Sequence, residues 1–113
     1  MIVVKDSEKQ IHVLSETASV QEYNTTDPAL GGAVASVEGR YPKKGFVVNL
    51  EVKQLAYVIS GMGKIVTPEG VHELAAGDMV FVAANEKYAW EGNLELFIAN
   101  APRFDSKQYR EVE

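Results

Sequence analysis

Few side chains in this sequence are suited to acid–base, metal or nucleophilic chemistry. There are two histidines, His12 and His72, and no cysteine, which excludes thiolate metal sites and cysteine nucleophiles. No Ser–His–Asp order or paired-carboxylate spacing is present, and Gly61-Met62-Gly63 lacks the following helix of a nucleotide-binding loop. We expect both histidines to be partly exposed strand residues. The alternative for His72 is an acid/base role at one end of the fold.

The charge distribution narrows the classes of partner. Sixteen acidic against eleven basic residues give a net charge of −5, and the basic residues are scattered, so no nucleic acid partner is expected. No apolar run approaches the roughly 20 residues that span a bilayer, and no secretory leader pattern opens the chain, so we expect a cytoplasmic protein without a membrane partner. Residues 40–44 form a basic loop around Pro42, expected to be solvated; attraction of an anionic ligand is the alternative.

The elements that position these residues are predicted to be β-strands almost throughout. Strand-sized apolar runs rich in branched and aromatic residues occupy 2–4, 11–14, 33–37, 46–50, 55–59, 63–67, 79–82 and 94–98. Glycine- and proline-containing turns separate them, which is typical of an all-β sandwich or barrel. We therefore expect one domain over residues 1–113, with a loose turn or helix in the polar tail from 105 to 113.

Two stretches make the fold more specific. Residues 58–65 (VISGMGKI) predict a strand, a tight glycine turn and a return strand, and residues 73–82 (ELAAGDMVFV) predict a strand, a Gly-Asp turn and another strand. In this order and separation, the region from 45 to 93 resembles the cupin superfamily. The resemblance implies an all-β fold, a cupin-type double-stranded β-helix or jelly-roll barrel.

The resemblance also places the metal-ligand positions of cupins, normally three histidines and a glutamate. Anchoring on Gly61 puts Gln54 at the glutamate position and Val47 and Asn49 at two histidine positions; anchoring on Gly77 puts Tyr88 at the third. Amide oxygens, a neutral phenol and a valine are poor ligands for transition metals. The resemblance therefore implies neither a metal nor another cofactor at this site.

The same positions imply a ligand-binding lumen. Strand alternation would turn Asn49, Gln54, Tyr88 and Trp90 inward, and would carry Glu51 to the mouth of the lumen. A phenol, an indole and two amides suit hydrogen bonding and stacking against a sugar ring or a small organic acid. The alternative is that Tyr88 and Trp90 fill the barrel as core residues.

These features favour a metal-free cupin-like protein that binds a small polar molecule. One alternative is a metal-independent isomerase or epimerase with Tyr88 as acid and Glu51 or His72 as base; another is a structural or interaction module with a filled barrel. We also expect a homodimer, because Leu55, Tyr57 and Ile59 have the parity opposite to Gln54 and the strands between residues 2 and 14 could pair across a two-fold axis.

Overall fold

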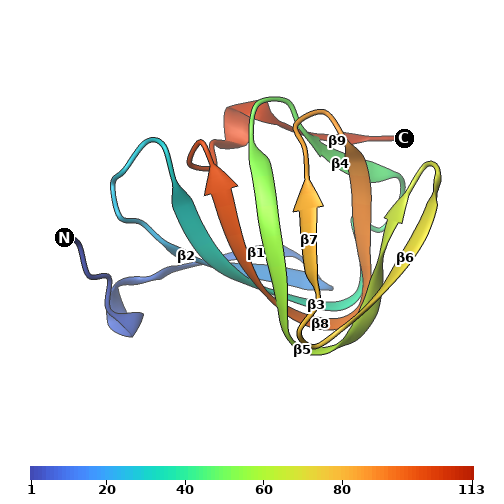
Figure 1. The fold of residues 1–113 in the computed structure, drawn as a ribbon, viewed down its shortest axis with the longest axis horizontal. Helices are drawn as coiled ribbons and strands as arrows, with labels where there is room; N and C mark the ends of the chain where they lie inside the picture. The colour runs from blue at the N-terminus through green and yellow to red at the C-terminus, as the bar shows by residue number, and fades with distance from the viewer.

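The computed structural model of the protein describes residues 1–113 as antiparallel strands with two short 3-10 turns (Figure 1). The strands are β1 Gln10–Ser15, β2 Ala18–Tyr23, β3 Gly31–Tyr41, β4 Phe46–Asn49, β5 Lys53–Thr67, β6 Gly70–Ala75, β7 Met79–Val82, β8 Lys87–Ala101 and β9 Tyr109–Val112. The 3-10 turns are η1 Asp6–Glu8 and η2 Ser106–Gln108. The all-β prediction is confirmed. None of the helical turns is long enough to cross a membrane.

Strand β8 organises the sheet. It lies between β3, which pairs with it from Gly31 to Tyr41, and β5, which pairs with it from Lys53 to Val66. Strands β1 and β2 extend the sheet beyond β3, β6 and β7 pair with β5, and β4 joins the start of β8 to β9. Long strands that curl with β8 give the sheet the shape of a half-barrel, with walls facing each other across an interior (Figure 1).

The curl of the sheet depends on glycines where β5 pairs with β8. The tight turn that the sequence predicted at residues 60–63 is wrong. The chain does not reverse at residues 60–63; β5 continues, with a register shift between Val58 and Ser60. Gly61 has a φ of 93°, and a Cβ there would clash with the carbonyl oxygen of Asn93. Gly92 on β8 has a φ of 122° and approaches Gly63. Glycine therefore produces a bend with close backbone contact instead of a turn. The predicted turn at Gly77 is confirmed, between β6 and β7.

Other predictions differ at the ends and in length. Residues 2–4 form no strand, although they are apolar, and β2 was not predicted because its polar side chains mask the alternation. The run at 94–98 belongs to the much longer β8. The tail forms η2 and then β9, which pairs with β4, because an isolated helix of so few residues is marginal in water.

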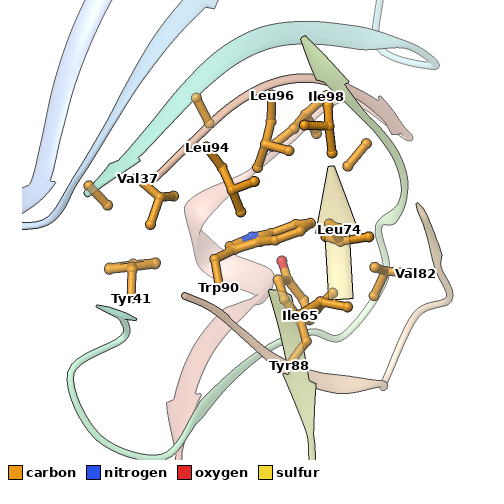
Figure 2. Packing of buried hydrophobic residues seen from close by; sticks show 14 of the residues in the cluster. Val37, Tyr41, Ile65, Leu74, Val82, Tyr88, Trp90, Leu94, Leu96 and Ile98 are labelled. Atoms are coloured by element: carbon orange, nitrogen blue, oxygen red, sulfur yellow. The ribbon is translucent and has the colours of Figure 1, made fainter. Parts of the chain in front are cut away.

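The core lies inside the curl. Leu94, Leu96 and Ile98 from β8 pack on one side of Trp90, and Tyr88 lies on its other side (Figure 2). The facing strands β2 and β3 present small side chains to the interior, namely Ala18, Ala33 and Ala35. Small residues on one wall opposite large ones on the other leave the interior only partly filled.

Candidate functional site

A cavity of about 790 Å³ occupies the interior of the half-barrel. Its volume lies within the roughly 300–1,000 Å³ typical of small-molecule pockets. Thirteen of its 23 lining residues are hydrophobic, three of them tyrosines, and the remainder includes two amides, a histidine and an arginine. An apolar cavity with a few directed polar groups is the usual construction of a binding site.

Three of the predicted site residues form a hydrogen-bonded chain in this interior. Asn49 Nδ2 donates to the Tyr88 hydroxyl over 3.1 Å, and that hydroxyl donates to Gln54 Oε1 over 3.1 Å. The three side chains come from β4, β8 and β5, and all are buried. Tyr88 and Gln54 line the cavity, whereas Asn49 lies behind them and holds the phenol in place.

The buried chain continues into η2 through a residue that the sequence did not indicate. Gln108 Nε2 donates to Asn49 Oδ1 over 2.7 Å, and Gln108 Oε1 accepts from the backbone N–H groups of Glu51 and Val52. The side-chain amide of Gln108 thus fixes the β4–β5 loop, although 57 residues separate it from Glu51 in the sequence. Gln108 sits in a charged tail without apolar periodicity, so no local signal marked it as buried.

Glu51 does not take the position expected for it. Strand β4 ends at Asn49, so the alternation stops there, and the Glu51 side chain is exposed in the loop before β5. It is not among the residues that line the cavity. The loop is held by the Glu51 N–H bond to Gln108, which leaves the carboxylate facing solvent.

Trp90 combines the two roles that the sequence left open. It belongs to the buried core cluster and also lines the cavity, with its ring 5.8 Å from that of Tyr88 in an edge-to-face arrangement (Figure 2). The aromatic pair therefore forms a rigid wall of a cavity, because edge-to-face packing fixes both rings.

A second pair of phenols lines the cavity and was not predicted as part of a site. The hydroxyls of Tyr41, at the end of β3, and Tyr109, at the start of β9, lie 3.0 Å apart. Burial raises the pKa of each phenol above its ordinary value, so both are neutral at physiological pH. Two hydroxyls that share one hydrogen bond retain one further proton, which can be donated to a ligand.

The rim of the cavity carries the ionisable groups. His12 on β1 and Glu22 on β2 both line it, with Nε2 and Oε1 3.7 Å apart. Arg103 joins them and is held by a 3.0 Å hydrogen bond to Asn24 Oδ1. His72, the histidine for which an acid/base role was considered, lies on β6 and does not line this cavity.

No protein-family model and no curated protein matches the sequence. Among solved structures, Streptomyces PAC13, described as a unique nucleoside dehydratase, matches with a TM-score of 0.89 and 21% identity over 100% of this chain and 92% of that chain. An RmlC-like cupin from Shewanella frigidimarina matches with a TM-score of 0.70 and 18% identity, covering 87% of both chains. The protein has the cupin fold. Ectoine synthase from P. lautus is a further neighbour, with a TM-score of 0.74 and 14% identity over 100% of this chain and 91% of that chain.

Val47, Asn49, Gln54 and Tyr88 are all buried in this fold, but Asn49, Tyr88 and Gln54 are hydrogen-bonded to one another and do not form a metal-ligand set. No three histidine, aspartate or glutamate side chains converge anywhere in the structure. Asn49 and Gln54 direct their oxygens at Gln108 and Tyr88, respectively. These residues do not fit a transition metal, which requires imidazole, carboxylate or thiolate donors.

The environment of Tyr88 in this cupin fold disfavours its use as an acid. Burial raises the pKa of its phenol well above the ordinary value, an effect that the hydrogen bond from Asn49 offsets only in part. Its proton is directed at a neutral amide oxygen, and neither Glu51 nor His72 lines the cavity to act as a base. Tyr88 is suited to fixing the shape of the cavity.

Proposed function

We propose that the protein binds a small polar molecule containing a ring in the cavity of its cupin fold, without a transition metal. The observation that carries this proposal is the cavity of about 790 Å³ with Trp90 and Tyr88 in its wall. Aromatic walls offer apolar contact to a planar or sugar ring, and the Tyr41–Tyr109 pair offers a hydroxyl donor.

The solved neighbours support a trial of particular compound classes. Structures of Streptomyces PAC13 contain uridine, and the fold match covers all of this chain. Nucleosides combine a planar ring with a sugar, which suits a cavity with aromatic walls and scattered polar groups. Sugars and small organic acids remain the other two classes to compare.

A ligand screen tests the proposal. Uridine, other nucleosides, free sugars and small organic acids are titrated while the fluorescence of Trp90, the single tryptophan, is followed together with the melting temperature. Ala35→Leu adds bulk to the cavity wall and should weaken binding of any cavity ligand at least tenfold. Ala99→Leu on β8, outside the cavity, is the matched control. Absence of binding by every class would favour a structural or interaction module instead.

A second candidate function is a metal-independent proton-transfer enzyme, such as an isomerase or epimerase. The observation that favours it is the His12–Glu22 pair at the rim of a cavity that also holds two phenols. Histidine is the side chain most used for proton transfer near neutral pH. Any compound that binds is incubated in D₂O, and NMR should show deuterium incorporation that His12→Asn abolishes while binding persists. No incorporation for any bound compound would contradict the enzymatic role.

A further inference from the structure

Two carboxamides lie side by side on the inner wall, at the end of the cavity where β5 and β8 pair. Gln54 on β5 is directly opposite Asn100 on β8 in the antiparallel register. Opposed residues on one face of such a pair have Cβ atoms roughly 5 Å apart. Both side chains are buried and both line the cavity.

Asn100 carries the one buried side-chain polar atom in the protein that lacks a partner. Its residue is 6% exposed, and its Oδ1 accepts no hydrogen bond from any protein group. Buried polar atoms are nearly always hydrogen-bonded, and an unpartnered one next to a cavity indicates a place for a ligand. Asn100 Oδ1 therefore offers an acceptor to a molecule in the cavity.

Gln54 offers the opposite function. Its Oε1 accepts the hydrogen bond from Tyr88, which fixes the orientation of the amide. The Nε2 hydrogens have no hydrogen-bond acceptor within the protein, so they are available as donors. The donor Gln54 Nε2 on β5 and the acceptor Asn100 Oδ1 on β8 are therefore neighbours. The hydrogen bonds of Tyr88 and Asn49 fix Gln54, and burial restricts Asn100.

We propose that Gln54 and Asn100 recognise the edge of a cyclic amide or imide, whose N–H donates to Asn100 Oδ1 and whose neighbouring C=O accepts from Gln54 Nε2. The inference rests on the proposed small-molecule binding and specifies the ligand's chemistry. A lactam or imide ring presents these two groups side by side and in one plane, which matches adjacent carboxamides. Hydroxyl groups can also donate to one amide and accept from the other, but their O–H bonds rotate, whereas a lactam or imide holds its donor and acceptor fixed in one plane.

Paired probes test this recognition by removing one donor from the ligand. Uridine is compared with 3-methyluridine, and 2-piperidone with N-methyl-2-piperidone, by Trp90 fluorescence and calorimetry. Methylation of the ring nitrogen should weaken binding to the native protein at least tenfold. Asn100→Leu should weaken binding of uridine and 2-piperidone to a similar extent, without a further loss for the methylated probes. Gln54→Glu, which keeps an oxygen for Tyr88 but removes the amide donors, is the second variant.

The control and the outcomes separate this inference from the proposed function. Asn93→Leu makes the same change on β8 at an exposed position outside the cavity and should leave all affinities unchanged. Equal binding of methylated and unmethylated probes, or losses that simply add, would overturn the amide recognition. Binding of sugars or organic acids without any lactam or imide would overturn it as well, while the proposed function stands. Binding of no compound at all would overturn both.

Discussion

At the scale of single residues, the hydroxyl of Tyr88 joins the amides of Asn49 and Gln54 in the buried interior. Tyr88→Phe leaves a buried donor and a buried acceptor unpartnered, so we expect the free energy of unfolding to fall by about 1–3 kcal/mol. Urea unfolding followed by circular dichroism measures this change. Tyr23→Phe, which removes a half-buried hydroxyl with no hydrogen-bond partner in the protein, should change it by less than about 0.5 kcal/mol. Equal effects of the two variants would contradict the role of the buried hydroxyl.

Asn49 and Asn100 are both buried, but they differ in their partners. Asn49 is bonded through both ends of its amide, whereas Asn100 Oδ1 has no partner. Asn49→Leu should therefore destabilise the protein by about 1–3 kcal/mol, and Asn100→Leu should stabilise the ligand-free protein by a smaller amount, because an unpaired buried acceptor is removed. Melting temperatures of the two variants, measured without ligand, check this difference in sign. A destabilised Asn100→Leu protein would show that Oδ1 is satisfied in solution.

The buried phenol of Tyr88 also predicts the response to alkaline pH. Burial raises its pKa in the folded state above the value of about 10 in the unfolded chain. Its contribution to stability is therefore complete below pH 10 and is lost as pH rises beyond that value towards the raised pKa of the folded state. Urea unfolding at pH 8, 9, 10 and 11 should show falling stability above pH 10. The decline in stability above pH 10 should be shallower in Tyr88→Phe. Identical stability profiles for the two proteins would show that the pKa of Tyr88 is not raised in the folded state.

At the scale of the elements, the bend of β5 depends on Gly61. Gly61→Ala combines a strained positive φ with a clash against the Asn93 carbonyl, whereas Gly77→Ala in the β6–β7 turn has a positive φ with open space around the added methyl group. We expect Gly77→Ala to cost about 1–2 kcal/mol and Gly61→Ala distinctly more. Denaturant midpoints of the two variants provide the comparison. Similar midpoints would mean that β5 bends without help from this glycine.

The same two glycines show how far the sequence determines the elements. Gly77 and Asp78 are typical turn residues and lie between two short apolar runs, so the turn between β6 and β7 was predictable. Gly61 lies between equally short runs, but the runs are halves of one strand, and only its partner β8 shows that the chain bends there instead of reversing. Local periodicity does not distinguish a turn from a bend, because both interrupt the alternation at a glycine.

The candidate site divides in a similar way. The cupin motif spacing placed Asn49, Gln54, Tyr88 and Trp90 together, and the structure brings these four into one buried region. Tyr41 and Tyr109 could not be predicted, because 68 residues separate the two phenols and Tyr109 lies in a tail with no apolar pattern. Contacts made by that tail depend on β9 pairing with β4, which composition does not indicate.

At the scale of the whole molecule, the outer face of the sheet carries a band of exposed apolar side chains. On one side of β5, Leu55 is opposite Phe81 and Tyr57 is opposite Met79, both on β7. On the other side of β5, Tyr57 is opposite Phe97 on β8. Phe81 is 58% exposed and Met79 is 60% exposed, and both lie next to the other exposed apolar residues of the band. A contiguous apolar band of this kind typically marks an association surface.

We therefore expect a homodimer that buries this band. Sedimentation equilibrium at micromolar concentration should give about twice the chain mass of 12.4 kDa. Phe81→Glu should produce monomers by placing a charge in the interface, and Val71→Glu, at an exposed position on β6 outside the band, should not. A native protein that sediments near 12.4 kDa would contradict the dimer. The edge of β1, which pairs only with β2, is the alternative contact if Phe81→Glu remains dimeric.

Gln108 and Tyr109 follow strands β1 to β8 in the chain, and this affects the order in which buried contacts form during translation. Strands β1 to β8 contain the half-barrel and most of its core, and all of them leave the ribosome before η2 and β9. Asn49 Oδ1 and the Tyr41 hydroxyl gain their partners only when residues 108 and 109 emerge. A nascent chain can therefore collapse around Trp90 before η2 and β9 have emerged, but this wall of the cavity is completed only after they follow.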